Sequence, residues 1–179
     1  VLILLPEIAL TSSWKARFEK WFGREPYIWH SSVPSARRKL IWRKAISGQS
    51  LVVAGARSAL FLPFSQLSLI VIDEEHDGSY KQDNHPRYFS HEIAQWRCRY
   101  HQCALILGSA TPSVTSFLAS QDNTTPTSTG YHELPHRATG SSLPRVTTID
   151  MTEHGKTGQL LSTPLQEAIE ATLAKQQKV

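Results

Sequence analysis

The sequence of residues 69–76 is Leu-Ile-Val-Ile-Asp-Glu-Glu-His, in which four aliphatic side chains are followed at once by four ionisable ones. An uninterrupted aliphatic run of this length is typical of a strand buried on both faces of a parallel sheet. Asp73, Glu74, Glu75 and His76 then fall at the carboxyl end of that strand, the edge at which open α/β sheets bind their ligands. This stretch therefore predicts both an α/β fold and the place of its site.

Apolar runs alternate with segments of helical period along most of the chain, as they do in parallel sheets with crossover helices. Four further strands are predicted, at residues 1–5, 26–29, 51–54 and 104–107. Helices are predicted to begin at Ser12 or Ser13, near Pro34, after Ser90 and after Pro112. The first should present one apolar face and close at Gly23; that face consists of Trp14, Phe18, Trp21 and Phe22. The expected architecture is a three-layer parallel sheet with helices on both faces.

Composition sets wider limits on the class of protein. The 179 residues are 40% hydrophobic and 19% charged, which suits one globular domain with a tail. The net charge of +4 permits an anionic partner without requiring one. Cys98 and Cys103 are too few for a disulfide framework, which favours a reducing cytoplasm. The apolar run at residues 1–5 stops at Pro6, so neither a signal peptide nor a membrane span is predicted.

Composition changes near the end of the chain. Residues 121–145 are rich in Asn, Thr, Ser, Pro and Gly and are predicted to form a flexible linker. Beyond them a strand is expected at residues 146–149, and a helix is expected with Thr163 as N-cap, Pro164 at its first position and Gln166 completing a capping box. Because the sequence starts without Met inside an apolar run and stops abruptly, we expect it to be truncated at both ends.

The acidic stretch suits nucleotide hydrolysis, in which one carboxylate holds Mg²⁺ through its water shell and the next orients the attacking water. Two alternatives remain open. Charged strand ends are common, so the stretch could be a solvated acidic turn. All four side chains are also competent metal ligands, although consecutive side chains diverge and one metal could not easily collect them.

A second motif follows the strand expected at residues 104–107, namely Gly108-Ser109-Ala110-Thr111-Pro112. The hydroxyls of Ser109 and Thr111 could form a hinge that touches the carboxylates. Alone, the motif is a helix-entry turn with Thr111 as its cap. The occurrence of two such motifs on successive strands favours a functional site.

Four segments together resemble the first motor lobe of the bacterial primosomal helicases, the PriA family of helicase superfamily two. They are residues 5–11, Leu-Pro-Glu-Ile-Ala-Leu-Thr; 55–61, Gly-Ala-Arg-Ser-Ala-Leu-Phe; 71–82, with Asp-Glu-Glu-His and Ser-Tyr-Lys-Gln; and 108–113, Gly-Ser-Ala-Thr-Pro-Ser. The acidic and Ser-Ala-Thr motifs are specific only to the superfamily. The first segment and the Tyr-Lys-Gln stretch narrow the likeness to the family.

The resemblance implies an ATP-dependent DNA helicase with RecA-like lobes that restarts replication at stalled forks and loads the primosome. Asp73 would hold Mg²⁺ through water and Glu74 would activate water, while Ser109 and Thr111 would couple hydrolysis to lobe movement. Glu75 and His76 would belong with them to the residues that couple the nucleotide and Mg²⁺. Other residues would contact DNA, because hydroxyls, one Arg and aromatic faces suit phosphates and unpaired bases. They are Pro6, Glu7, Thr11, Arg57, Ser58, Tyr80, Lys81, Arg87 and Tyr88. The implied partners are single-stranded and forked DNA, other primosome proteins and single-stranded DNA-binding protein.

The chain departs from the family's pattern in the loop that would sense DNA. His85 stands where Gly is usual, which should stiffen the loop. Phe89-Ser90-His91-Glu92 replaces a more usual His-Ala-Arg-Asp, so the coupling role of that Arg is left open.

No GxxxxGK[ST] phosphate loop occurs in the sequence, and the resemblance places it just upstream of Val1. Residues 1–120 would then be the first RecA-like lobe without its phosphate-loop strand and helix, and residues 146–179 the start of the second lobe. ATP and Mg²⁺ are the expected cofactors, with zinc only in a downstream part. The fragment alone should hydrolyse ATP negligibly. The alternative is a non-catalytic nucleic-acid-binding module of the same fold.

Overall fold

A computed structural model of the chain describes residues 1–6, 11–121, 130–136, 146–154 and 160–176. The chain divides into two compact units, Val1–Tyr131 and His132–Val179, and each is described by itself. None of the described helices is long and apolar enough to cross a bilayer.

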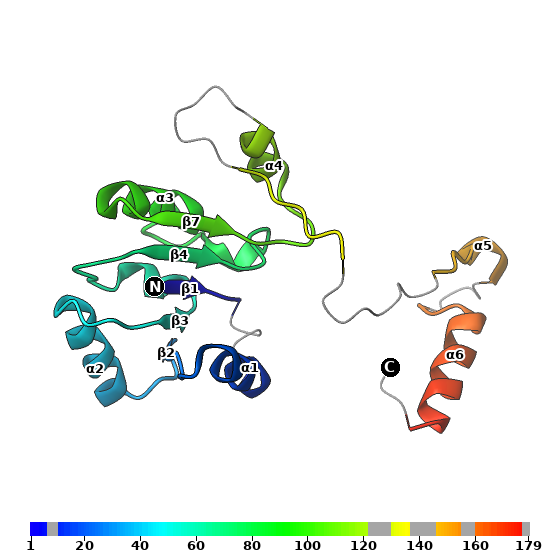
Figure 1. The fold of residues 1–179 in the computed structure, drawn as a ribbon. Helices are drawn as coiled ribbons and strands as arrows, with labels where there is room; N and C mark the ends of the chain where they lie inside the picture. The colour runs from blue at the N-terminus through cyan, green and yellow to red at the C-terminus, as the bar shows by residue number, and fades with distance from the viewer. Residues whose placement is uncertain (7–10, 122–129, 137–145, 155–159, 177–179) are drawn as a thin grey trace. The chain divides into compact units, whose positions relative to one another are not determined.

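The first unit is built on a five-stranded sheet in the order β2-β3-β1-β4-β7, in which every pairing is parallel (Figure 1). The strands are β1 (Leu2–Leu4), β2 (Tyr27–Trp29), β3 (Val53–Gly55), β4 (Leu69–Ile72) and β7 (Ala104–Leu107). All five strands predicted from the sequence therefore form, shortened by one or two residues at some ends. The predicted parallel α/β fold is confirmed.

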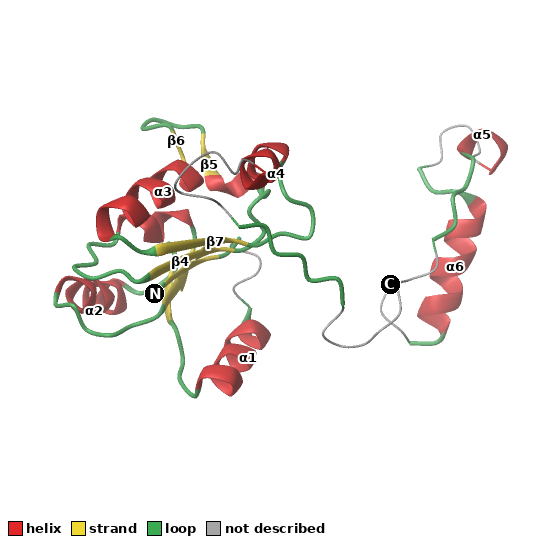
Figure 2. Ribbon diagram, turned by 45° about the horizontal axis from the view of Figure 1, so that its top comes forward, coloured by secondary structure: helices red, strands yellow, loops and turns green. Residues whose placement is uncertain are grey.

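Side chains alternate along the strands between two cores. One core contains the even-numbered positions of β1 and β4 and is covered by α2 (Ser35–Ile46) and α3 (Ser90–His101), which contribute Ile41, Ala45, Ala94 and Cys98. The other core contains Leu5, Ile28, Val33 and Ala54, with Trp14 of α1 (Ser12–Phe22) packed against it. Figure 2 shows α3 and α1 on opposite sides of the sheet, so the predicted three layers are confirmed.

The second face is covered less completely toward β7. Ile3, Val71 and Ile106 are neighbours in register across β1, β4 and β7. Ile106 is nevertheless 52% exposed on the edge strand. Strands of parallel sheets are normally buried on both faces, so the edge at β7 is unusually open.

Helix α1 departs from the sequence prediction at its start and on its outer face. Thr11 rather than Ser12 or Ser13 is the N-cap, because its side chain accepts the bond from the N–H of Trp14. Gly23 closes the helix with φ 67°, as predicted. Trp21 and Phe22 are 74% and 62% exposed, contrary to the single buried apolar face predicted. Of the four aromatic residues only Trp14 packs against the core of the sheet, and Phe18 stacks on Trp14.

Several other helix caps are displaced by one or two residues. Pro34 occupies the N-cap of α2, not its first turn. Helix α4 (Val114–Gln121) starts after Ser113, whose hydroxyl accepts from the N–H of Ser116, so Thr111 is not its cap. Neighbouring hydroxyl residues have nearly equal capping ability, and the backbone path decides among them.

The second unit contains α5 (Met151–His154) and α6 (Thr163–Ala174). Ser162 rather than Thr163 caps α6, with its hydroxyl accepting from the N–H of Leu165. The strand predicted at residues 146–149 does not form, and no other strand is described in this unit with which it could pair. The linker and second-lobe assignments stay predictions, since much of residues 121–145 lies outside the described part.

Candidate functional site

The backbone after β4 brings the acidic stretch and the Ser-Ala-Thr motif to the same edge of the sheet. Strand β4 lies between β1 and β7, and its ladder continues one step further. The N–H of Asp73 donates to Leu4 O at 3.0 Å, and the N–H of Gly108 donates to Ile72 O at 2.8 Å. A Cβ at Gly108 would lie 3.4 Å from Asp73 Oδ1, so a side chain larger than a methyl group would press on that carboxylate.

Asp73 is exposed at this rim and has one carboxylate oxygen to spare. Oδ1 accepts from the N–H of Glu74 at 3.1 Å, whereas Oδ2 bonds no group in the described part of the chain. The Asp73 carbonyl accepts a 2.6 Å bond from the hydroxyl of Tyr80. Burial, with the nearby charges of Asp73, Asp77 and Glu74, raises the pKa of Tyr80, which therefore stays a proton donor. This bond holds the backbone that carries the carboxylate.

Glu74 has a left-handed backbone, with φ 48°. This conformation is disfavoured for a residue with a Cβ by about 1 kcal/mol or more, and such strain is concentrated at functional sites. Its carbonyl accepts from the N–H of Asp77 at 2.8 Å, which closes a tight turn. The Glu74 side chain is 48% exposed, and Oε2 lies 3.6 Å from Nδ1 of His76.

His76 links the two motifs. Its Nδ1 and the hydroxyl of Ser109 are hydrogen-bonded at 2.6 Å. The same hydroxyl accepts from the N–H of Thr111 at 3.0 Å. The structure thus brings together the residues predicted to lie around the nucleotide, from Asp73 on one strand end to Thr111 beyond the other.

Glu75 points away from this rim into a buried network. Its side chain is 2% exposed. Oε1 accepts from the N–H of Ser113 at 2.5 Å, and Oε2 accepts from the hydroxyls of Ser116 at 2.9 Å and Ser113 at 3.2 Å. Burial alone would raise the pKa of Glu75, but these hydrogen bonds, with the nearby His91, hold that pKa below its ordinary value. Glu75 is therefore ionised and has no surface for a nucleotide.

His91 completes the network from the start of α3. Its Nε2 lies 3.1 Å from Oε2 of Glu75, and its Nδ1 has no partner in the described part of the chain. Burial lowers the pKa of His91 although the Glu75 carboxylate opposes that shift. A neutral imidazole beside an ionised carboxylate must carry its proton on Nε2, so His91 donates to Glu75.

The sequence did not identify this network. Its members are Glu75, His91, Ser113 and Ser116, of which only Glu75 was a predicted site residue. One signal was available: consecutive side chains diverge, so Glu74 and Glu75 could not both face the rim. The serines at positions 113 and 116 also have the spacing of a helix cap and the residue it bonds.

The predicted DNA-contact residues fall into two groups, of which the first is exposed or half-exposed. Lys81, Arg87 and Tyr88 of this group lie on a hairpin formed by β5 (Lys81–Gln82) and β6 (Tyr88–Phe89). Lys81 pairs with Asp83 at 3.3 Å, and Nε of Arg87 donates to Asp83 O at 3.0 Å. Tyr88 is half-buried, with its ring edge-on to Phe61 at 5.1 Å. Ser58 is exposed, and Thr11 is exposed while it caps α1.

The second group is engaged within the protein. Tyr80 is only 1% exposed, so the prediction that it contacts DNA is wrong: its ring is part of the core and its hydroxyl holds Asp73. Pro6 is buried at the end of β1, so its ring cannot contact DNA either. Arg57 is half-buried and donates through Nη1 to the carbonyls of Ser79 and Lys81, at 2.9 and 2.6 Å. Glu7 lies outside the described residues.

The rim suits a cation held through water better than one ligated directly. Among the described residues no three His, Cys, Asp or Glu side chains converge as a metal site would require. Glu75 is occupied by its buried partners, which removes it from any shared coordination sphere. The exposed Asp73 carboxylate, with Oδ2 free, fits the outer shell of Mg²⁺, which usually keeps several waters.

Comparison with known proteins gives consistent results. A family model described as DEAD/DEAH box helicase matches residues 1–118. The chain is 38% identical over 179 residues to Replication restart protein PriA of Bacillus subtilis (strain 168), which covers 97% of this chain and 21% of that protein. It is 40% identical to the protein of the same name in Synechocystis sp., over 99% of this chain and 22% of that protein. The protein of the same name in Rickettsia felis is 43% identical, over 100% of this chain and 27% of that protein. The chain thus spans about a fifth to a quarter of the length of these relatives.

Proposed function

The chain belongs to the DEAD/DEAH box helicase family, and on that basis we propose that it forms part of the first motor lobe of an ATP-dependent DNA helicase of the replication-restart type. One observation carries this proposal. Asp73 and Glu74 stand at the carboxyl rim of a parallel sheet, and His76 joins them to Ser109 on the next strand. This is the edge at which such sheets bind their ligands.

Each rim residue has a chemical role in this proposal. The free oxygen of Asp73 would hold Mg²⁺ through water, and the bound ion would supply charge neutralisation at the phosphates. Glu74 orients a water toward the terminal phosphate of ATP and takes its proton as the phosphorus–oxygen bond to ADP breaks. Its left-handed backbone and exposed carboxylate suit a residue held for a reaction.

Coupling runs through hydrogen bonds that join separate segments. His76 and Ser109 connect the ends of β4 and β7. Glu75 connects the same turn to Ser113 at the start of α4 and to His91 at the start of α3. Because His91 follows β6 by two residues, a shift of the hairpin that carries Lys81, Arg87 and Tyr88 is transmitted to the acidic turn. This supports DNA-dependent hydrolysis.

The open edge at β7 is where the proposal places the phosphate loop. Ala104 and Ile106 are exposed on one face of β7, and a further strand with its crossover helix would cover them. The sequence itself contains no GxxxxGK[ST] motif, and this favours a second candidate function, a non-catalytic nucleic-acid-binding module. The two candidates differ in whether ATP is cleaved when a phosphate loop is supplied.

The partners, cofactors and cellular compartment are proposed together with the activity. The nucleic-acid partners are single-stranded and forked DNA, with other primosome proteins and single-stranded DNA-binding protein in the same assembly. The cofactors are ATP and Mg²⁺, with zinc only in a downstream part, and the compartment is the cytoplasm. These assignments draw on the likeness to the replication restart relatives.

A chimaeric protein tests the proposal, with this chain in place of the matching segment of the Bacillus subtilis relative. ATP turnover should be measured with and without single-stranded DNA. Glu74→Gln should lower turnover by about 100-fold or more, since it removes a general base, and should leave nucleotide binding intact. The matched control is Glu92→Gln, at an exposed carboxylate on α3, which should leave turnover within about twofold.

Turnover that survives in Glu74→Gln would contradict the role of that carboxylate. A chimaera that binds single-stranded DNA but cleaves no ATP, although the unmodified relative cleaves it, would support the non-catalytic module instead.

A further inference from the structure

Positive charge is concentrated in one segment of the chain. Between Pro26 and Ile72 the sequence contains no Asp or Glu, and it contains six cations, namely Arg37, Arg38, Lys39, Arg43, Lys44 and Arg57. The whole chain has a net charge of only +4, so the remaining residues are net negative. A local excess of this kind attracts an anion to one surface rather than to the protein as a whole.

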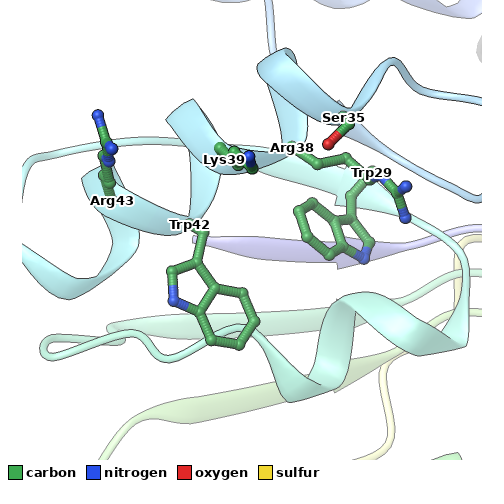
Figure 3. A pocket seen from close by; sticks show the side chains of 6 residues that line it. All are labelled: Trp29, Ser35, Arg38, Lys39, Trp42 and Arg43. Carbon is green, nitrogen blue, oxygen red and sulfur yellow. The ribbon is translucent and has the colours of Figure 1, made fainter.

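Five of the exposed or half-exposed positions of α2 fall on one face of that helix. Ser35, Arg38, Lys39, Trp42 and Arg43 follow the i, i+3, i+4, i+7, i+8 spacing. With Trp29 from the end of β2, they line a hollow of about 390 Å³ (Figure 3). The hollow lies on the β2 side of the sheet, and none of its lining residues belongs to the rim at Asp73.

Two indoles are the aromatic part of this hollow. Figure 3 shows Trp29 and Trp42 on the same side of α2, with Arg38 and Ser35 near Trp29 and Lys39 on the helix above the two rings. Trp29 is half-buried and packs partly against the core. Trp42 is 44% exposed, so much of its ring is open to a ligand.

The cations of the hollow have no partner among the described residues. Arg38, Lys39 and Arg43 form no ion pair with a described carboxylate, whereas the neighbouring Lys44 bonds Gln49 and lies over the ring of Tyr27. Nε of Arg38 is buried without a hydrogen-bond partner. Lys39 and Arg43 are like charges four residues apart on one helix, an arrangement that destabilises a helix unless an anion lies between them.

We propose that this hollow binds one nucleotide of a single-stranded nucleic acid, with the base stacked on Trp42 and the flanking phosphates held by Arg38, Lys39 and Arg43. Aromatic faces beside cations are the usual means of holding unpaired nucleotides without reading their sequence. A simple inorganic anion would pair with the cations but would make no use of the two aromatic rings. The hollow shares no residue with the hairpin or the Arg57 segment, so it is a separate subsite. The proposal that it binds nucleic acid rests on the proposed function only for the class of ligand.

The backbone of the hollow is bonded to a segment that the proposed function assigns to DNA. The N–H of Ala56 donates to Trp29 O at 3.2 Å, and Ala56 is the residue that precedes the short helix Arg57–Phe61. Trp29 and the segment that carries Ser58 therefore follow from the neighbouring strands β2 and β3. The subsite lengthens the path of single-stranded DNA toward the β2 edge of the sheet.

The test uses the 179-residue chain and a fluorescein-labelled oligothymidylate of about 15 nucleotides, with binding followed by anisotropy. Trp42→Ala should weaken binding about tenfold, the effect of one lost base stack. Trp42→Tyr should restore most of the affinity, because it keeps an aromatic face. The matched control Trp96→Ala removes an indole that is 64% exposed on α3 and should change the dissociation constant by less than about twofold.

Salt dependence tests the cations separately from the rings. Arg43→Gln should lower the slope of log Kd against log salt concentration by about 0.7, as the loss of one phosphate contact to a single strand does. The control is Arg99→Gln, at an exposed cation on α3, which should leave the slope unchanged. An oligomer of abasic sites, which has the phosphates and lacks the bases, should bind the Trp42→Ala variant and the parent chain equally.

Three results would overturn the subsite. They are equal affinity of oligothymidylate for Trp42→Ala and the parent chain, binding of free thymidine monophosphate as tight as that of the oligomer, and tighter binding of an acidic peptide than of DNA. The double variant Lys81→Gln, Arg87→Gln reports on the hairpin contact of the proposed function. If that variant weakens binding and Trp42→Ala does not, the hollow is excluded while the proposed function stands. The reverse result supports the hollow and counts against the hairpin.

Discussion

The buried network of Glu75 behind the rim and the hollow beside α2 use polar groups in opposite ways. In the network the ionised Glu75 is buried and is bonded by Ser113, Ser116 and His91. In the hollow the cations of α2 have no counter-charge in the described part of the chain. A buried network whose members are all hydrogen-bonded to one another holds a fixed geometry. Exposed charges that have no counter-charge in the protein attract an external ligand instead. Mutations should therefore affect stability at the first region and binding at the second.

The largest effect on stability is expected for Glu75→Ala. It leaves the Ser113 N–H, the serine hydroxyls and His91 without their acceptor, and the loss of such a buried partner destabilises by about 3 kcal/mol. Urea unfolding followed by circular dichroism measures the free energy of unfolding. Glu74→Ala, one residue away with a half-exposed side chain, should change it by less than about 0.5 kcal/mol. Equal losses in the two variants would remove the distinction between rim and buried network.

The same network should make stability depend on pH. Burial lowers the pKa of His91 below its ordinary value of 6.5, so the unfolded chain binds a proton more readily than the folded one below that pH. Stability is then complete above pH 6.5 and falls as the pH drops toward the folded pKa, by at most about 1.4 kcal/mol per pH unit. The lowered pKa of Glu75 acts in the same direction, but only below its ordinary 4.5.

Unfolding free energies measured from about pH 7.5 to about pH 5.5 cover the titration of His91 and also of His101, whose pKa is lowered by burial as well. His91→Gln retains an N–H that can donate to Glu75 and does not titrate, so its pH dependence in this window should be smaller than that of the parent chain. An unchanged slope in His91→Gln would assign the pH dependence to another group.

The smallest effect is expected in the hollow and has the opposite sign. Lys39→Glu replaces a repulsion with Arg43 by an i, i+4 attraction, which should stabilise the chain by about 0.5 kcal/mol. The same substitution should weaken binding of single-stranded oligothymidylate. A loss of stability would show that Lys39 already has a partner within the protein, which would bring the hollow closer in character to the rim.

The sequence was most informative where local pattern and burial agree. Residues 69–72 are aliphatic because β4 is the buried neighbour of two other strands, so both the strand and the carboxylates at its end were predictable. The fold class followed from the same alternation of apolar runs and helices. Gly108 was consistent with the close approach of the end of β7 to the Asp73 carboxylate at the end of β4.

Features that depend on a partner distant in sequence were not predictable. Glu74 and Glu75 are chemically identical, and only the position of Ser113 and His91 shows which one is buried. Tyr80 was assigned to DNA because exposed aromatic residues stack on bases, whereas its hydroxyl is bonded to Asp73 O in the core. The apolar face of α1 was predicted from spacing, yet the sheet covers only its first two turns and leaves Trp21 exposed.

Asp73 is proposed to hold the cation of the nucleotide, so its role can be measured by the binding of a metal ion. Mn²⁺ should be titrated into the Bacillus subtilis chimaera in the presence of ATP and followed by electron paramagnetic resonance. Asp73→Asn should weaken the nucleotide-dependent binding of Mn²⁺ by about tenfold or more, whereas Asp77→Asn, which alters the carboxylate that accepts from the N–H of Ser79, should leave it unchanged. Equal Mn²⁺ affinity in Asp73→Asn and the parent chimaera would contradict the assignment of this rim as a site of ATP hydrolysis.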